Sequence, residues 1–311
     1  MYGSFWIQNP CCPTWSQTIQ TWWGNIPPRL AEPGRFQIQI RSTPGIEIRE
    51  ANERDCQAIT EFWHRYFSTS SRCKCFVSPE YIQTCIKDGV WQIILAIDMR
   101  SGDLVGTGVR KYIENLHIGP AIWKKAAMID YFCVHPAWRK RGIGRSILGV
   151  LQNTGSVPLP PHLILWEGLH PSIPPLTIGC YWVKEKSGKT YINGTVQQLT
   201  RPPIWPPPES YIWSDWVSRK SKELHCWKTP SGMVIVCDTF HRRVPDGAKI
   251  GIVIYSSTDA SLEEFVEQGP YGVVLSPTKP SSPGWSLDSP WQLVGYNCIA
   301  APGISYPALG V

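Results

Sequence analysis

Apolar and polar residues alternate along the chain in patterns that predict both strands and helices. Two apolar runs, residues 91–97 and 104–112, flank a polar turn at 99–103 and predict a β-hairpin. Residues 126–134 are apolar on both faces, so we expect a central, buried strand there. The remaining apolar runs predict further strands at 46–51, 163–166, 233–237, 250–255, 272–275 and 292–297.

Helices are predicted where apolar residues recur at helical spacing behind a capping residue. Asn52 is expected to cap the first helix, with Asp55 accepting charge from its amide end. Ser78 followed by Pro79 begins a second helix, and Gly89 is expected to end it. The other predicted helices begin near residue 142 and cover residues 261–268.

The predicted elements fall into two similar sets separated by a proline-rich segment. Each set runs strand, strand, helix, strand, and the proline cluster at residues 201–208 lies between them. A chain of 311 residues is long enough for two such halves. We therefore expect an α+β protein with an extended arm over residues 1–44, an N-terminal half over 45–200 and a C-terminal half over 209–311.

Composition narrows the class of protein. A hydrophobic content of 42% is enough for sizeable hydrophobic cores. The net charge of +6 is only mildly positive. No nucleic-acid-binding motif is present, and an anionic cofactor would explain this charge. The 11 cysteines lack zinc-binding spacing, so we expect reduced thiols and no metal. The first residues lack the apolar run of a signal peptide and no segment approaches bilayer length, so we expect a cytoplasmic protein without stable membrane insertion.

The segment at residues 132–145 carries the most chemical information. Pro136 stops the buried strand, and a helix begins near Gly142, where first-turn amides have no partner within the helix and carry partial positive charge. Glycine at 142 and at 144 removes side chains that would keep an anion away. The basic residues around this helix start are Arg139, Lys140, Arg141 and Arg145. The pattern predicts a pyrophosphate site, and the alternative is a basic turn before an ordinary surface helix.

The whole run has the form apolar-x-Val-x-Pro-x-x-Arg-x-x-Gly-x-Gly. This form resembles the acetyl-CoA-binding motif of the GNAT superfamily of N-acetyltransferases, which also follows several antiparallel strands. A nicotinamide-dinucleotide fingerprint fits worse, because its glycines would directly follow the first strand. The resemblance implies a coenzyme-A-dependent N-acyltransferase.

Within that superfamily the chain resembles one family almost from end to end, the glycylpeptide N-tetradecanoyltransferases or protein N-myristoyltransferases. The similar segments are Phe-Trp at 5–6, Asn-Pro at 9–10, Ser-Pro-Glu-Tyr at 78–81, Ile-Asp-Tyr-Phe-Cys-Val-His at 129–135, the basic positions after it, Gly-Cys-Tyr-Trp at 179–182 and Tyr-Asn at 296–297. The fold implied by this resemblance is two tandem GNAT-like halves with mixed, mostly antiparallel sheets.

The resemblance also implies roles for single residues. The backbone amides of Tyr131 and Phe132 would hold the thioester oxygen, because fixed amide dipoles stabilise the oxyanion formed when an amine attacks a thioester. Phe5 and Trp6 would contact the coenzyme, and the C-terminal carboxylate of Val311 would deprotonate the attacking glycine amine. The other implied coenzyme contacts are Cys133, Val134, Arg139, Lys140, Arg141, Gly142, Ile143, Gly144 and Arg145. The co-substrate would be an acyl-CoA, either myristoyl-CoA or acetyl-CoA.

Two acidic residues depart from the family pattern. Asp130 stands where the family has Asn, and Glu167 falls near a Thr of the family. Both lie on strands that we expect to be buried and adjacent, where an acid is costly unless it is paired or used. Two neighbouring carboxylates would raise one pKa toward that of a useful base, so either residue is a candidate additional or replacement base. The alternative is a structural acid bonded to backbone or to arginine.

Three further features bear on substrate and chemistry. The Ser-rich stretch at 68–75 replaces an acidic peptide-recognition loop of the family, and Gly142 with Gly144 is closer to acetyl-transferring relatives, which leaves the acyl length open. His135 is expected to be structural. Cys133 is expected to pack in the core, because no partner base for a nucleophilic thiol is visible.

The sequence therefore predicts direct transfer of an acyl group from acyl-CoA to the N-terminal amine, glycine in the first instance, of a protein or peptide. The predicted enzyme is a monomer that binds no nucleic acid. Two alternatives stay open. One is an N-acetyltransferase that uses acetyl-CoA. The other is a catalytically inert acyl-CoA-binding protein, which Asp130 and the altered loop favour.

Overall fold

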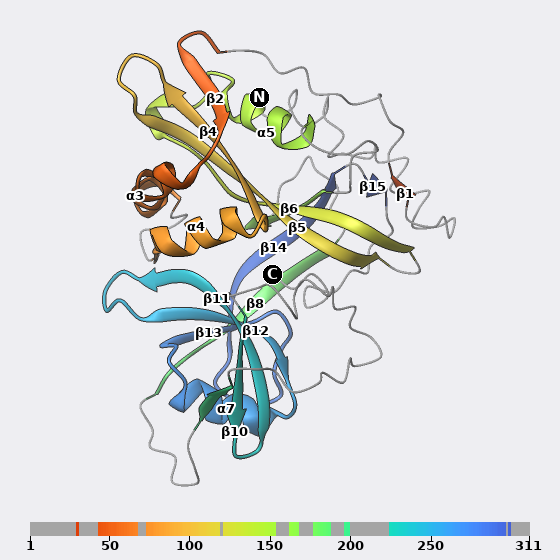
Figure 1. Cartoon of the computed structure of the whole chain (residues 1–311). Coiled ribbons are helices and arrows are strands. Elements are labelled where there is room, and N and C mark those ends of the chain that lie inside the picture. The colour runs from red at the N-terminus through yellow and green to blue at the C-terminus, as the bar shows by residue number, and fades with distance from the viewer. Residues whose placement is uncertain are drawn as a thin grey trace.

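A computed structural model gives the chain a mixed α+β fold (Figure 1). The structure describes residues 29–30, 43–67, 73–118, 121–153, 162–167, 177–187, 196–199, 224–296 and 298–299. Most of the predicted arm over residues 1–44 and the whole proline cluster at 201–208 lie outside these ranges, so both stay predictions. None of the helices in the described ranges combines the length and the apolar character needed to span a membrane.

The N-terminal half builds a sheet around the predicted hairpin and covers it with helices. Its strands are β2 (Ile46–Glu50), β3 (Cys73–Cys75), β4 (Trp91–Asp98), β5 (Leu104–Ile118), β6 (Ala121–Val134) and β7 (His162–Glu167). Its helices are α3 (Cys56–Tyr66), α4 (Pro79–Lys87) and α5 (Ile143–Asn153). The elements predicted for this half are confirmed, while β3 was not predicted and β5 and β6 are longer than expected.

Side-chain caps explain where the first two helices begin. Asn52 Oδ1 accepts a hydrogen bond from Arg54 N (2.9 Å), and Asp55 Oδ2 accepts one from Asn52 N (2.8 Å), which together cap a 3₁₀ turn that leads into α3. Ser78 Oγ accepts a hydrogen bond from Tyr81 N (3.2 Å) at the start of α4. Both predicted helix starts are confirmed.

The C-terminal half also combines strands with helical structure. In the part of the chain that the structure describes, it has a single helix. Its elements are β10 (Leu224–Thr229), β11 (Gly232–Arg243), β12 (Lys249–Ser256), α7 (Asp259–Gln268), β13 (Val273–Ser276) and β14 (Ser286–Tyr296). Two strands precede it, β8 (Thr177–Glu185) and β9 (Gln197–Leu199), and a separate small pair joins β1 (Arg29–Leu30) to β15 (Cys298–Ile299). The predicted strands and helix of this half are confirmed, whereas β8, β9 and β10 were missed.

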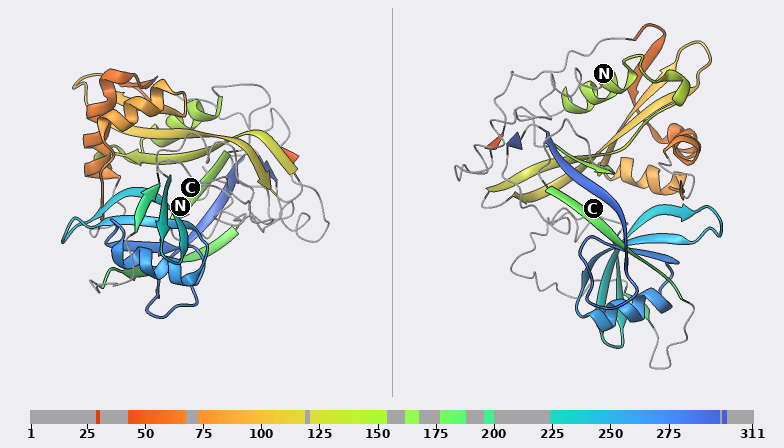
Figure 2. Two further views of the ribbon diagram at one scale, coloured as in Figure 1. Left: turned by 60° about the horizontal axis from the view of Figure 1, so that its bottom comes forward. Right: turned by 180° about the vertical axis from the view of Figure 1, so that it is seen from behind.

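One sheet runs through both halves. Among the described residues it has 13 strands in the order β2-β4-β5-β6-β7-β14-β8-β13-β12-β11-β10-β9, with β3 attached to β11. Only the pairs β6/β7 and β12/β13 are parallel there. The halves exchange strands, because β14 pairs with β7, β8 pairs with β13, and β8 and β14 pair with each other. Figure 2 shows β8 and β14 side by side where the halves meet.

The two halves follow the same order of elements. In each, three successive antiparallel strands lead into a helix and then into a strand parallel to the third, as β4-β5-β6-α5-β7 and as β10-β11-β12-α7-β13. The register of β6 against β5 and of β12 against β11 shifts near the same place, so each third strand carries one extra residue. The expected architecture of two similar halves is therefore confirmed.

The helices lie on both sides of the N-terminal strands (Figure 1), and each buries an apolar face. On one face, α3 and α4 bury Ile59 and Ile82. On the opposite face, α5 buries Ile147 and Leu151 against β4, β5 and β6. In the C-terminal half, α7 buries Phe265 against β11 and β12. Burial of this kind is the main favourable term in folding and gives each half a core of its own.

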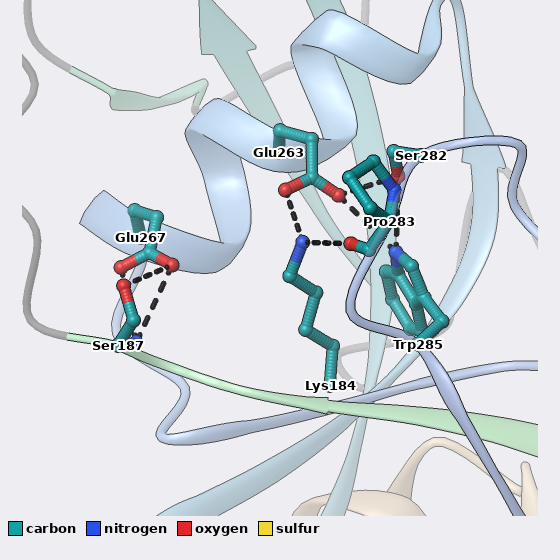
Figure 3. Close-up of polar contacts among 7 residues, drawn as sticks. All are labelled: Lys184, Ser187, Glu263, Glu267, Ser282, Pro283 and Trp285. Atoms are coloured by element: carbon teal, nitrogen blue, oxygen red, sulfur yellow. Dashed lines mark hydrogen bonds and ion pairs between the residues drawn. The ribbon is translucent and has the colours of Figure 1, made fainter.

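A polar network fixes α7 against β8 and the loop before β14 (Figure 3). The carboxylate of Glu263 forms an ion pair with Lys184 and accepts hydrogen bonds from Ser282 Oγ (2.6 Å) and Trp285 Nε1 (3.1 Å). Lys184 Nζ also donates to the carbonyl of Pro283 (2.8 Å). Burial acts to raise the pKa of Glu263, but these donors outweigh it and hold the pKa below its usual value.

Candidate functional site

The parallel strands β6 and β7 separate at their carboxyl ends. Their ladder begins with Ala127 opposite His162 and ends with Ile129 opposite Ile164. Beyond it, β6 continues over residues 130–134 beside β5, and β7 continues beside β14. The facing edges of the two strands are thus not paired with each other at this end. In sheets with parallel strands, ligands bind outside the carboxyl ends of such strands.

A β-bulge lies on β6 where this separation begins. Asp130 is opposite Val109 and Cys133 is opposite Thr107, so β6 has one residue more than β5 between these pairs. Tyr131 has a φ of 45°, a left-handed conformation that costs a non-glycine residue about 1–2 kcal/mol. Backbone strain of this kind persists only where the surroundings enforce it, and it is concentrated at functional sites.

Packing and hydrogen bonds hold Tyr131 in this conformation. Its side chain is buried and its ring stacks on that of Trp63, with 4.2 Å between the centroids. Its carbonyl accepts a hydrogen bond from Thr107 Oγ1 (3.0 Å), which itself accepts one from Trp63 Nε1 (2.9 Å). Its amide donates to Asp130 Oδ1 (2.6 Å). The bulge is therefore fixed through the ring, the carbonyl and the amide of one residue.

Asp130 is engaged by two partners. Oδ1 accepts the amide of Tyr131, and Oδ2 lies 2.8 Å from Lys111 Nζ. These contacts are of the kind expected for a structural acid, with lysine in place of arginine. They also mean that one of the two amides assigned to the thioester oxygen already has an acceptor. The β6/β7 ladder ends before it reaches Asp130 and before it reaches Glu167, so strand pairing does not make these two acids neighbours.

The start of α5 stands at the carboxyl end of β6. The residues after Val134 form a 3₁₀ turn over Pro136–Trp138, and α5 begins at Ile143. A Cβ placed on Gly144 would lie 3.1 Å from Phe132 Cζ and 3.8 Å from Val134 Cγ2, so the first turn of α5 lies directly against the end of β6. The predicted sequence of strand, turn and helix is confirmed, and it brings the helix start close to the bulge.

The turn at residues 139–142, here called the basic turn, leaves this helix start exposed. Its residues Arg139, Lys140, Arg141 and Gly142 are all exposed. No acidic residue lies in the first turn of α5, and within the described residues these three cations form no ion pair. The partial positive charge of the helix start therefore adds to theirs, which is an arrangement suited to a phosphate.

Contacts inside the basic turn fix its shape. Arg139 Nε donates to the carbonyl of Val134 (3.1 Å), and the guanidinium of Arg141 lies 4.7 Å from the centre of the Trp138 ring. Lys140 has a φ of 64°. In the described ranges three non-glycine residues have positive φ, and two of them, Tyr131 and Lys140, belong to this site. The strain is therefore concentrated where the sequence places the coenzyme.

The two glycines of the motif serve different purposes. Gly142 has a φ of 86°, and a Cβ there would meet only Thr43 Oγ1, at 3.7 Å, so the position needs glycine for its backbone and stands open to a ligand. At Gly144 a Cβ would press on the Phe132 ring, and at Gly108 of β5 it would lie 3.3 Å from the same ring. Gly144 therefore makes room for Phe132, a packing role that the sequence did not indicate, while its predicted role beside an anion stays a prediction. The ring of Phe132 stands between β5 and α5 and is 36% exposed.

Cys133 and His135 have surroundings that suit structural roles. Cys133 is buried in the core, and burial raises its pKa to about 12, which leaves little of the reactive thiolate at neutral pH. His135 Nδ1 accepts a hydrogen bond from Ala137 N (3.2 Å), and its ring meets the Tyr66 ring edge-on. Within the described ranges no group of three or more histidine, cysteine or acidic side chains is placed to hold a metal ion.

Several predicted site residues lie beyond what the structure describes. Phe5, Trp6 and Val311 are outside the described ranges. Glu167 is opposite Trp291 at the end of β7, but its side chain is not among those described. Their roles stay predictions. Arg145 is half-buried beside the basic turn, and its Nε has no hydrogen-bond partner.

Lys111 is the residue of this site that sequence reasoning missed. Its side chain is 4% exposed, and its ammonium group lies 5.1 Å from the centre of the Trp91 ring and 5.0 Å from that of Tyr131. The available signal was a lysine inside the apolar run 104–112. A charge in a buried strand needs a partner, and that requirement points to the acid on the next strand, Asp130.

Comparison with solved structures shows which proteins share this fold. An N-myristoyltransferase of Saccharomyces cerevisiae with bound myristoyl-CoA and inhibitors aligns with a TM-score of 0.66 at 10% identity, covering 97% of this chain and 91% of that chain. Another structure of the yeast enzyme with bound myristoyl-CoA aligns with a TM-score of 0.63 at 10% identity, covering 89% and 85%. A Pyrococcus horikoshii protein proposed to be an acetyltransferase aligns with a TM-score of 0.51 at 12% identity, covering 84% and 96%.

These likenesses concern the fold, because the sequence identities are low. No protein-family profile matches the chain, and no curated protein sequence is significantly similar to it. The chain thus has the two-halved fold of N-myristoyltransferases, with mostly antiparallel strands, and the residues of its site must carry any statement about chemistry.

Proposed function

We propose that the protein is an acyl-CoA-dependent N-acyltransferase that acylates the N-terminal amine of a protein or peptide. One observation carries the proposal: the exposed, positively charged basic turn leads into the start of α5, which lies against the end of β6, next to a strained β-bulge where β6 and β7 separate. An acyl-CoA has a pyrophosphate and a thioester at two points of one long molecule. Binding and activating it requires an anion site and an oxyanion donor near each other, and these elements would supply both.

The coenzyme end of the site is proposed to use the basic turn and the first turn of α5. The amides of Ile143 and Gly144 would donate to the pyrophosphate, with Arg139, Lys140 and Arg141 supplying charge around it. The open space beside Gly142 supports this assignment, because a phosphate could approach the backbone there. Arg145, the third residue of α5, would add a further positive charge, and Phe5 and Trp6 would cover the coenzyme.

The proposed reaction is direct transfer. The free amine attacks the thioester carbonyl, a C–N bond forms and the C–S bond breaks. A base takes the proton that the amine nitrogen loses and passes it to the departing thiolate, so that coenzyme A leaves as its thiol. The amides of the Tyr131–Phe132 bulge would stabilise the oxyanion formed on the way. The C-terminal carboxylate of Val311 is the proposed base, and Glu167 or Asp130 is the alternative.

The acyl group and the acceptor are proposed from the fold neighbours. Two of them are N-myristoyltransferases with bound myristoyl-CoA, which makes myristoyl-CoA and a peptide beginning with glycine the first substrates to test. The third neighbour and the small residues Gly142 and Gly144 favour acetyl-CoA as the alternative donor.

An inert acyl-CoA-binding protein is the second candidate, and the engagement of Asp130 favours it. The amide of Tyr131 already donates to Asp130 Oδ1 at 2.6 Å, so one proposed oxyanion donor is satisfied within the chain itself. A protein of this kind would bind acyl-CoA and release it unchanged.

Binding and transfer can be measured separately on the purified protein. Titration calorimetry with coenzyme A, myristoyl-CoA and acetyl-CoA measures binding, and mass spectrometry of a panel of glycine-led peptides measures transfer. We expect saturable binding and a peptide mass increase of one acyl group on the α-amine, with no increase for the same peptides acetylated at that amine. Binding without transfer would favour the inert protein, and the absence of both would overturn the proposal.

A further inference from the structure

Lys111 joins the two strands that meet at the bulge. It lies on β5, and its ammonium group is 2.8 Å from Oδ2 of Asp130 on β6. With a side chain 4% exposed, it is also held between the faces of the Trp91 and Tyr131 rings. A buried ammonium group needs such compensation for the loss of water, and the arrangement provides it through a carboxylate and two aromatic rings.

Asp130 passes this restraint on to the backbone. Its other oxygen, Oδ1, accepts the hydrogen bond from the amide of Tyr131, the residue in the left-handed conformation. One carboxylate thus connects a fixed cation on β5 to the strained peptide unit on β6. The side chain of Asp130 is 26% exposed, so the ion pair lies at the edge of the core next to solvent.

We propose that Lys111 and Asp130 form a positioning pair that holds the Tyr131–Phe132 bulge in the geometry needed for acyl transfer, rather than a base and its neighbour. This inference rests on the proposed function, which gives Lys111 no role. The left-handed φ of Tyr131 is unfavourable by itself, so without the pair the bulge relaxes toward ordinary extended backbone. The direction of the following amide, that of Phe132, changes with it.

A base role for Asp130 fits these contacts less well. A general base needs a free lone pair within reach of the proton that it takes. Here each oxygen already accepts one bond, from an amide and from an ammonium group at 2.8 Å, so fewer of its lone pairs can face a substrate. An asparagine could still accept the hydrogen bond from Tyr131, whereas it could not serve as a base. This difference lets substitution separate the two roles.

The test uses Lys111→Met, Asp130→Asn and the double variant in the full-length protein. We expect Lys111→Met to lower kcat by on the order of tenfold to a hundredfold, because it leaves the carboxylate without its cation and the amide of Phe132 out of place. Asp130→Asn should lose less, and the double variant should recover most of the turnover lost in Lys111→Met. The affinity for coenzyme A should stay within about twofold in all three, because the basic turn is untouched.

A second readout reports on the bulge without needing turnover. Hydrogen exchange of a peptide covering residues 128–134 should be faster in each single variant and return toward the wild-type rate in the double variant. The pH–rate profile of the double variant should keep the wild-type shape. Loss of turnover in both Asp130→Asn and the double variant, with loss of one limb of that profile, would make Asp130 the base and overturn the proposal.

A matched ion pair in the other half controls for general loss of stability. Lys184 and Glu263 have side chains that are 14% and 20% exposed, and Lys184 also lies over an aromatic ring, that of Trp285 (Figure 3). Lys184→Met and Glu263→Gln should lower stability and leave kcat unchanged. If the Lys111 and Asp130 variants behave in the same way, the pair is merely structural and the proposal fails. If the wild type transfers no acyl group, the proposed function fails, and the exchange rates still decide whether the pair holds the bulge.

Discussion

Gly142 occupies a backbone conformation that only glycine adopts at little cost. Its φ is 86°, and the place of a Cβ is open apart from Thr43 Oγ1 at 3.7 Å. We expect Gly142→Ala to lower the free energy of unfolding by about 1–2 kcal/mol through backbone strain. We also expect it to weaken binding of coenzyme A by about tenfold, because the relaxed turn moves the first amides of α5 away from the phosphates. Chemical denaturation and titration calorimetry measure the two effects.

Gly102 provides the matched control for this substitution. It has a φ of 75° in the turn between β4 and β5, and no atom lies within 4 Å of the place of a Cβ. Gly102→Ala should therefore cost a similar amount of stability and leave the affinity for coenzyme A unchanged. If the two variants weaken binding equally, the effect comes from stability and the basic turn is not the phosphate site.

Two buried thiols should make the free energy of unfolding fall at alkaline pH. Burial raises the pKa of Cys75 and of Cys133 from 9.0 to about 12. Between these values the unfolded thiols lose protons and the folded ones keep them, so the unfolded state is favoured as pH rises. Below about pH 9 these thiols should add no pH dependence to the free energy of unfolding. Above it, each thiol should lower that free energy by roughly 1.4 kcal/mol per pH unit.

Urea titrations at pH 8, 9 and 10 measure this slope. Cys133→Ala should have a shallower decrease than the wild type between pH 9 and 10, although its stability at pH 8 is lower because a buried side chain is shortened. An unchanged slope in Cys133→Ala would show that other groups cause the alkaline loss.

At the scale of single residues, the sequence identified positions better than it identified their contacts. Asp130 was recognisable because an acid interrupts an apolar strand, and Gly142 was recognisable because glycine has a known conformational use. The partner of Asp130 lies on another strand, so finding Lys111 required the register of β5 against β6. The left-handed conformation of Tyr131 has no sequence signal at all, since tyrosine rarely adopts it and the surrounding packing imposes it.

At the scale of elements, the corresponding helices α5 and α7 begin in opposite ways. The start of α7 is closed by a capping box, in which Thr258 Oγ1 accepts from Ser261 N (3.0 Å) and Ser261 Oγ from Thr258 N (3.2 Å), and Asp259 adds a negative charge. The start of α5 has basic neighbours, an open glycine and no acid in its first turn. Only α5 is thus suited to an anion, although both helices follow a bulged third strand.

Hydrogen exchange with and without coenzyme A tests this difference between the helices. Saturating coenzyme A should slow exchange at the amides of residues 143–145, because bound phosphates accept them, and leave residues 259–261 unchanged. A peptide covering α4 serves as an internal reference that should not respond. Protection at the start of α7, or none at the start of α5, would contradict the assignment.

Elements with local signals were predicted, and elements held by distant partners were missed. The hairpin β4–β5 and the starts of α3 and α4 carry turn and capping residues next to one another in the sequence. The strand β8 follows a stretch crowded with prolines, and its partners β13 and β14 come about a hundred residues later, so little in its own pattern marks it as a strand. The exchange of strands between the halves was beyond sequence reasoning for the same reason.

At the scale of the whole molecule, this exchange makes the two halves dependent on each other. The strand β7 has only a short ladder with β6, and its other edge is covered by β14 from the C-terminal half. The strand β13 has a ladder of similar length with β12, and its other edge is covered by β8, which precedes that half. Cutting the chain between the halves would therefore expose strand edges that pair readily with other molecules.

We expect that neither half folds when it is produced alone, and that the two halves fold when they are produced together. Fragments 1–205 and 206–311, divided in the proline cluster, should each be insoluble or lack a cooperative unfolding transition, because each lacks the strand that completes its sheet. Co-expressed, they should form a soluble one-to-one complex, and the intact chain should unfold in a single transition by circular dichroism and tryptophan fluorescence. A soluble, cooperatively folded N-terminal fragment would contradict this interdependence. It would also mean that the proposed coenzyme site, whose described residues lie on β6, in the basic turn and on α5, can be studied without the other half.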